Sequence, residues 1–141
     1  MNLTERSADP SHIPVIFSQA KDLIDTYEDL SAIDYDRVLS WVQRKITQNI
    51  CAYRVLHLDG DLCACYRLCQ DGELDDLYVL PDYQNRGIGS AILEKCIRRS
   101  VAPVWMYVFA KNTRAIALYE RFGFTLREKV GHTRLILERK G

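Results

Sequence analysis

The 141-residue sequence has no long apolar run, little glycine or proline, and no net charge. No segment approaches the roughly 20 apolar residues that a membrane-spanning helix needs, so we expect no membrane helix. Residues 1–6 contain no apolar segment of the kind found in signal peptides, so we expect a cytoplasmic protein. Seven glycines and four prolines are scattered along the chain without forming a linker, and we therefore expect one domain over residues 1–141.

Metal-site and disulfide patterns are also missing, although five cysteines are present. No Cys-x-x-Cys pair or matching histidine spacing occurs, which excludes the common zinc motifs, so we expect no metal. Cys63 and Cys65 alternate along a predicted strand, and this spacing predicts both thiols on one face. We expect reduced, mostly buried thiols that act as small apolar side chains, with a redox or metal role as the alternative.

Charge excludes one class of partner and suggests another. The sequence pI is about 6.8 and no strand interleaves basic and aromatic residues, so we expect no nucleic-acid binding. Residues 1–36 hold eight acids and two bases, and the rest of the chain carries the opposite excess. Such asymmetry can steer a cation and an anion to different ends of a protein, although solvated helix faces produce the same pattern.

Apolar periodicity predicts the order of the elements. Helical spacing is found at residues 14–30, 34–49, 87–99 and 113–122. Strand patterns occupy residues 3–7, 53–58, 62–68, 74–80, 104–109, 124–129 and 133–138. We place Trp41 on the inner face of the second helix, and the unbroken apolar run at 104–109 predicts a strand covered on both faces. The predicted fold is α/β, with a mixed, mostly antiparallel sheet of six or seven strands and about four helices.

The segment Gln84-Asn85-Arg86-Gly87-Ile88-Gly89 lies between a predicted strand and a predicted helix. The first N–H groups of a helix lack backbone partners and favour phosphate, and glycine lets a phosphate approach closely. Arg86 adds a positive charge, while tight packing remains the alternative reason for the glycines. The Walker loop is excluded by spacing and by the missing lysine, and Ile92 stands where a dinucleotide fingerprint needs its third glycine.

Two segments together resemble one known family. Residues 77–89, LYVLPDYQNRGIG, resemble the acetyl-CoA-binding motif V-x-P-x-[YF]-[QR]-x-x-G-[IVL]-[GA] of the GNAT N-acetyltransferase superfamily. Residues 112–124, NTRAIALYERFGF, resemble the family's N-x-x-A-x-x-[LF]-Y-x-x-x-G-F. The resemblance implies the GNAT-type acyl-CoA N-acyltransferase fold of single-domain, bacterial-type members. It also implies transfer of an acetyl group from acetyl-CoA, as cosubstrate, to a primary amine by direct attack in a ternary complex.

The resemblance also implies which residues contact acetyl-CoA. Leu77, Tyr78 and Val79 would line the pantetheine arm, and a backbone N–H near Val79 would stabilise the carbonyl oxygen as it becomes negative. The pyrophosphate loop and the start of the second motif would supply the other contacts: Gln84, Asn85, Arg86, Gly87, Ile88, Gly89, Ser90 and Asn112. A helix N-cap is the structural alternative for Asn112, and both roles are compatible.

Two side chains are candidates for proton transfer. The family match makes Tyr119 the candidate acid for the leaving thiolate, whereas its helical spacing alone predicts a core aromatic. Glu73 is the candidate base, because some family members carry a glutamate at this distance before the loop. Asp75 lies two residues further along the predicted strand, and clustered carboxylates raise one another's pKa. A solvated hairpin end is an equally good interpretation of Glu73.

The acceptor is less determined than the donor. Some protein N-terminal acetyltransferases of the superfamily carry a glutamate five residues before the motif asparagine, where this sequence has Tyr107. In this superfamily the first two helices and the last hairpin build the acceptor pocket, so the acidic first quarter favours a small cationic amine or a lysine-like or peptidyl acceptor. The alternative is an inactive acetyl-CoA-binding sensor that regulates a partner. We expect a monomer or homodimer, without nucleic acid or membrane partners.

Overall fold

The computed structural model describes residues 2–140, which form four α-helices, seven strands and four short 3-10 turns. The helices are α1 (Ile13–Tyr27), α2 (Tyr35–Gln48), α3 (Ile88–Arg99) and α4 (Thr113–Arg121). The strands are β1 (Leu3–Ser7), β2 (Arg54–Leu58), β3 (Asp61–Leu68), β4 (Leu74–Val79), β5 (Trp105–Phe109), β6 (Phe124–Val130) and β7 (Arg134–Arg139). The predicted fold class is confirmed, and its strands are divided between two antiparallel sheets, β1-β2-β3-β4 and β5-β7-β6.

The two sheets meet at the first residues of β4 and β5. Glu73 and Trp105 form an isolated parallel bridge there, and the backbone N–H of Trp105 donates to the carbonyl of Gly72 at 3.1 Å. Beyond this bridge no further ladder joins β4 to β5 within residues 2–140, so the two strands diverge. The predicted β-α-β crossover is therefore present, and its parallel pairing is limited to one bridge.

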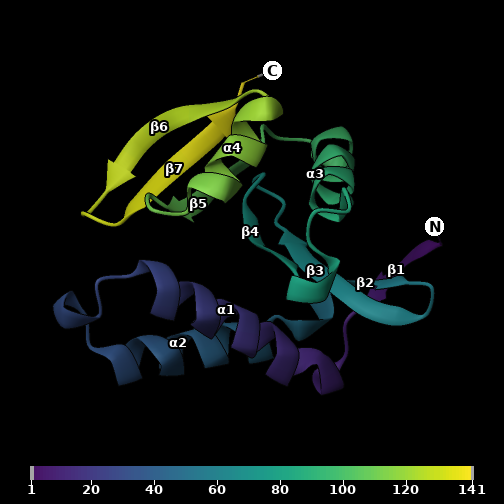
Figure 1. Cartoon of the computed structure of the whole chain (residues 1–141), viewed down its shortest axis with the longest axis horizontal. Helices are drawn as coiled ribbons and strands as arrows, with labels where there is room; N and C mark the ends of the chain where they lie inside the picture. The colour runs from purple at the N-terminus through teal and green to yellow at the C-terminus, as the bar shows by residue number, and fades with distance from the viewer. Residues whose placement is uncertain (1, 141) are drawn as a thin grey trace.

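Helices cover the sheets from two sides (Figure 1). The pair α1 and α2 lies below the first sheet, while α3 and α4 lie above, with α4 beside the ribbon of β6 and β7. One core is shared by α3, α4 and both sheets, and includes Ile88, Leu93, Met106, Val108, Tyr119 and Phe124. The other lies between α1, α2 and the first sheet, and includes Ile16, Ile24, Val42, Ile46, Val55 and Tyr78. None of the helices within residues 2–140 has the length and apolar character needed to cross a bilayer.

The end of α1 makes a second connection between the two halves. The ring of Tyr27 stacks on that of Phe109 at the end of β5, with centroids 6.1 Å apart. Beside it, the hydroxyl of Thr133, in the turn between β6 and β7, donates to the carboxylate of Glu28. The second sheet is thus attached both to the start of β4 and to the helical layer.

Two predictions about burial are wrong. Trp41 is 57% exposed, because the buried stripe of α2 follows Val42 and Ile46 and leaves the neighbouring position turned outward. Tyr107 is 45% exposed, although Met106 and Val108 on either side are buried. Only one face of β5 packs into the core that contains α4, so this apolar run is not covered on both faces.

The prediction that Cys63 and Cys65 share a face is also wrong. The β2–β3 ladder shifts register between Leu56 and His57, and Cys63 is the extra residue of the resulting bulge. An extra residue reverses the alternation of side chains. Cys63 therefore packs into the core beside α3, whereas Cys65 packs into the core beside α1 and α2. All five cysteines are free thiols, three of them buried.

Gly72 is required by the contact between the two sheets. A Cβ built on Gly72 would lie 2.2 Å from the carbonyl oxygen of Pro103, and its φ is +93°. Gly60, in the other Asp-Gly turn, has a φ of +91° and nothing within 4 Å of such a Cβ. Both alanine variants should carry the left-handed backbone cost of roughly 1 kcal/mol, and only Gly72→Ala should add a clash, worth about 2 kcal/mol. Urea unfolding of the two variants measures this difference, and equal destabilisation would contradict it.

Candidate active site

The predicted phosphate loop lies between the turn Pro81–Tyr83 and α3, which begins at Ile88. Asn85 and Gly87 adopt left-handed backbone angles, with φ of 64° and 81°. Gly87 is the N-cap of α3 and provides no side-chain acceptor, so the first N–H groups of the helix remain available to an anion. A Cβ on Gly89 would meet Leu118 and Val79 at 3.5 and 3.7 Å, so the first turn of α3 packs against both α4 and β4.

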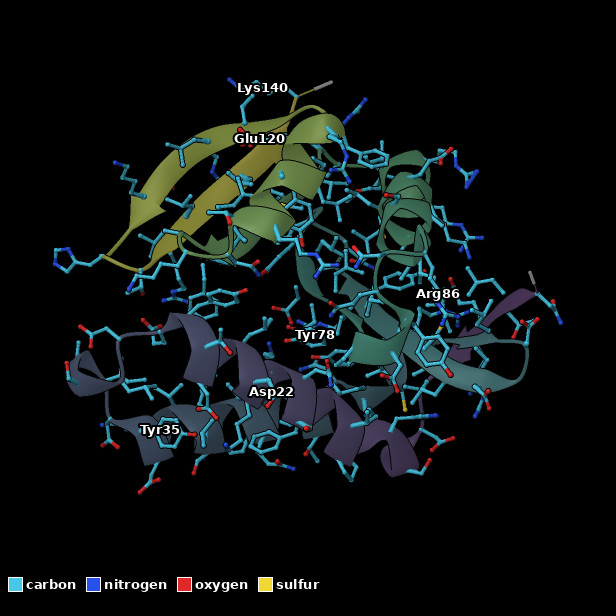
Figure 2. The ribbon with its side chains drawn as sticks, in the orientation of Figure 1. Asp22, Tyr35, Tyr78, Arg86, Glu120 and Lys140 are labelled. Carbon is cyan, nitrogen blue, oxygen red and sulfur yellow. The ribbon has the colours of Figure 1, made fainter. Side chains whose placement is uncertain are left out.

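Side chains tie this loop to its neighbours. The side-chain amide of Gln84 donates to the carbonyl of Val79 at 3.1 Å. The guanidinium of Arg86 stacks over the ring of Tyr83, with its central carbon 5.4 Å from the ring centroid. Figure 2 labels Arg86 below α3. Arg114, in the first turn of α4, donates to Gln84 Oε1 at 3.1 Å and to Asn85 Oδ1 at 2.5 Å. Arg114 was not among the residues predicted from the sequence, although an arginine in the first turn of a helix opposes the helix dipole and was an available signal.

The end of β4 faces the space where β4 and β5 diverge. The N–H of Leu80 donates to Cys63 of β3, and successive N–H groups of a strand point to opposite edges, so that of Val79 points away from β3. Leu77 and Val79 pack into the core beside α3. Tyr78 is buried on the opposite face, so only its backbone is available at this edge. This geometry is compatible with the predicted donor near Val79.

Tyr119 projects from α4 into the core beside Phe124, with ring centroids 5.9 Å apart. Its side chain is 8% exposed, and its hydroxyl makes no hydrogen bond to any of residues 2–140. Burial, followed by the negative charge of Asp76, raises the pKa of Tyr119 to about 12. The phenol therefore stays protonated at neutral pH, as an acid must. Asn112 caps α4 by accepting the N–H of Ala115 at 3.2 Å.

Glu73 is half-buried immediately before β4. Burial, and then the charges of Asp75 and Asp71, raise the pKa of Glu73. Asp75 itself is paired with Arg67 at 2.9 Å and with Lys45 at 3.3 Å.

Three possible metal ligands have their ligand atoms within 4.8 Å of one another at this hairpin end: Cys69, Asp71 and Glu73. The absence of a metal accordingly stays a prediction.

A buried carboxylate on β4 was not predicted from the sequence. Asp76 is 6% exposed and accepts hydrogen bonds from the hydroxyls of Tyr53 and Tyr78, the latter at 2.7 Å. The ammonium nitrogen of Lys45, in α2, lies 3.4 Å from Oδ2 of Asp76. Burial raises the pKa of Asp76, against the opposing charge of Lys45. Figure 2 labels Tyr78 between the helical layer and the elements above. Adjacent aspartates inside a strand, where aspartate is disfavoured, were the available signal.

Part of the chain is similar in sequence to named acetyltransferases. The sequence profile of the acetyltransferase (GNAT) family matches residues 11–124. The [ribosomal protein bS18]-alanine N-acetyltransferase of Escherichia coli K12 is 47% identical over 58 residues, which cover 38% of this chain and 39% of that protein. The mycothiol acetyltransferase of Beutenbergia cavernae is 37% identical over 81 residues, covering 50% of this chain and 27% of that protein. These matches thus span well under half of the relatives' own lengths.

Solved structures share the fold along the whole chain. The PaiA N-acetyltransferase of Thermoplasma acidophilum, in complex with coenzyme A, has a TM-score of 0.73 at 18% identity and covers 100% of both chains. The ribosomal-protein-S18-alanine N-acetyltransferase of E. coli has a TM-score of 0.62 at 23% identity, covering 98% of this chain and 93% of that one. Together with the profile match over residues 11–124, this fold establishes that the chain belongs to the acetyltransferase (GNAT) family.

Proposed function

We propose that the chain transfers an acetyl group from acetyl-CoA to a primary amine by direct attack in a ternary complex. One observation carries the proposal: a glycine loop with free helix N–H groups lies against both diverging β4 and the helix that holds Tyr119. Residues 84–90 and Asn112 would hold the cofactor there. Family membership supports CoA-dependent acyl transfer, and a neighbour of the same fold was crystallised with coenzyme A.

Three groups of this chain would act on the reacting atoms. The N–H of Val79 would stabilise the carbonyl oxygen as it becomes negative, a contribution of roughly 3 kcal/mol for donors of this kind. Glu73 precedes Val79 by the length of β4, roughly 20 Å in an extended strand, so it would accept the proton of the amine through a relay of waters rather than directly. Tyr119 would then protonate the departing thiolate. The raised pKa of Glu73 brings it nearer to neutrality, and that of Tyr119 keeps its proton in place.

A small cationic or lysine-like amine is the acceptor class we favour. Asp75 and Asp76 are already balanced by Lys45 and Arg67, so Glu73 and its neighbour Asp71 provide the negative charge beside the bridge. The indole N–H of Trp105 donates to the carbonyl of Asp71 at 3.3 Å, which places an aromatic ring at the same position. An ammonium group is attracted both by carboxylates and by aromatic faces, and one face of the Trp105 ring already carries the guanidinium of Arg127, 4.9 Å from the ring centroid.

A peptidyl amine is the second acceptor class. The E. coli relative acts, by its name, on the alanine of ribosomal protein bS18, and this favours an N-terminal peptide amine. Against it, the exposed Tyr107 occupies the position at which some N-terminal acetyltransferases carry a glutamate. The cytoplasmic location, the single domain and the monomeric or homodimeric state stay predictions alongside this proposal.

An acceptor screen that reads the release of CoA thiol tests the proposal. The panel contains diamines, lysine, neutral and acidic primary amines, and a peptide with N-terminal alanine. We expect the fastest release with cationic acceptors. Preference for acidic or neutral acceptors would remove the charge argument, and fastest release with the peptide would favour the second class. Tight binding of acetyl-CoA without release for any amine would support the inactive sensor.

Glu73→Gln should lower kcat/KM about 100-fold at neutral pH, because glutamine cannot accept the amine's proton. The base works only when ionised, so the wild-type rate falls as pH drops through the raised pKa of Glu73. The deficit of the variant should be smallest at high pH, where free amine is abundant. Asp71→Asn is the matched control: it removes a charge that raises the pKa of Glu73 and should move the acidic limb to lower pH. Parallel pH–rate profiles for wild type and Glu73→Gln would exclude Glu73 as the base.

A further inference from the structure

Arg114 connects α4 to the loop that precedes α3. Its two terminal nitrogens reach the side-chain oxygens of consecutive residues, Gln84 Oε1 at 3.1 Å and Asn85 Oδ1 at 2.5 Å. Gln84 in turn donates from its amide nitrogen to the carbonyl of Val79 at 3.1 Å. A continuous chain of hydrogen bonds therefore joins the first turn of α4, the loop and the end of β4.

The position of Arg114 is unfavourable for the helix that carries it. A cation in the first turn faces the positive end of the helix dipole, and α4 has no acidic residue in that turn to offset it. Arg114 is exposed and forms no ion pair within residues 2–140. Its hydrogen bonds are with the two loop amides alone, so the interactions that compensate for its position lie in the loop rather than in α4.

The planar guanidinium of Arg114 is well suited to holding two side-chain amides at once. Arginine presents five N–H donors in a rigid fork, which can engage two acceptors at once, whereas a lysine ammonium acts as a point charge. The acceptors belong to a loop in which Asn85 has a φ of 64°. Holding both amides restricts an exposed segment that otherwise has to be ordered when a ligand binds.

We propose that Arg114 is a positioning residue that clamps the cofactor loop, Gln84 to Gly89, in its binding geometry before acetyl-CoA arrives. This inference rests on the proposed function for its consequence, the affinity for acetyl-CoA. The clamp itself is a property of the free protein and can be tested without the cofactor. Arg121 offers a matched control, because it is exposed on the same helix and makes no hydrogen bond or ion pair within the described part of the chain.

Hydrogen exchange of the free protein is the first test. In Arg114→Ala, the hydrogen-bonded backbone amides that flank the loop, those of Tyr83, Gln84 and Ala91, should exchange about tenfold faster than in wild type, because local opening is no longer restrained. Arg121→Ala should leave them unchanged, and both variants should melt near the wild-type temperature. Unchanged exchange in Arg114→Ala would overturn the clamp.

Titration with acetyl-CoA is the second test. Arg114→Ala and Arg114→Lys should both bind about tenfold more weakly and raise KM for acetyl-CoA, because alanine has no donor and lysine lacks the rigid fork whose two nitrogens each hold one amide. Their kcat at saturating acetyl-CoA should stay within about twofold of wild type, since bound cofactor orders the loop. Wild-type affinity in Arg114→Lys would show that charge alone matters and would overturn the proposal. If wild type binds no acetyl-CoA, the proposed function fails, and the exchange experiment still decides whether the clamp exists.

Discussion

Replacing Tyr119 by phenylalanine should lower kcat for acetyl transfer by about 100- to 1000-fold and leave the affinity for acetyl-CoA unchanged. The thiolate that leaves has to gain a proton, and phenylalanine has none to give. Because burial raises the pKa of Tyr119 to about 12, the phenol remains in its acid form over the whole working range of pH. Steady-state kinetics at saturating acetyl-CoA, together with titration of acetyl-CoA, measures the two quantities separately.

The same substitution should leave the fold intact. The hydroxyl of Tyr119 makes no hydrogen bond to another described residue, and the ring that contacts Phe124 is retained in phenylalanine. A loss of rate in this variant therefore reports on chemistry rather than on stability. Tyr35→Phe is a control, because it removes an exposed hydroxyl that bonds Asp25 far from the loop. Wild-type turnover in Tyr119→Phe would remove Tyr119 from the mechanism and leave it as a core aromatic.

Gly89→Glu should abolish measurable binding of acetyl-CoA. Its carboxylate would stand in the first turn of α3, where the pyrophosphate is expected to take the free N–H groups, and two anions there repel each other. A long side chain at this position would also grow into the contact with Leu118 and Val79. We expect at least a 100-fold loss of affinity, a change of about 3 kcal/mol in binding free energy, in calorimetric titration.

Two other substitutions at the same position separate charge from bulk. Gly89→Ala places its Cβ at ordinary contact distances, 3.5 and 3.7 Å, so it should fold and bind nearly as wild type does. Gly89→Gln has the length of glutamate without its charge and should bind more weakly than alanine but better than glutamate. A negative charge in the first turn stabilises a helix, so the glutamate variant should unfold no earlier than the glutamine variant. Equal affinity of those two would place the pyrophosphate elsewhere.

Local rules predicted the elements of this fold well. The turn at Asp59-Gly60 has the left-handed angles that this dipeptide favours, with φ of 51° and 91°. Gly123 ends α4 with a φ of 88°, as its place after the helical pattern predicts. The two family motifs supplied the order of strand, loop and helix around the predicted cofactor site. Each of these features depends on residues close together in the sequence.

The features that escaped prediction depend on contacts between distant segments. The bulge at Cys63 follows from the register of two strands, and no single strand pattern shows it. Tyr107 is exposed because the face of β5 that carries it lies outside the core that contains α4, which an apolar run cannot indicate. Asp76 is buried only because Tyr53 and Lys45 come from other elements. Arg114 places a cation in the first turn of α4, where the helix dipole disfavours it. An unfavourable local choice of this kind is a sign of function.

The stacking of Tyr27 on Phe109 has a mechanical consequence. The first sheet is joined to β5 by the Glu73–Trp105 bridge, β5 to α1 by the aromatic stack, and α1 back to the first sheet by their shared core. These three contacts form a closed loop through the first sheet, β5 and α1. The two sheets cannot rotate relative to each other unless one of these contacts breaks or one of the three elements bends. The angle between the two sheets is therefore fixed by these contacts. A ligand that needs a wider opening between the sheets has to break at least one of them.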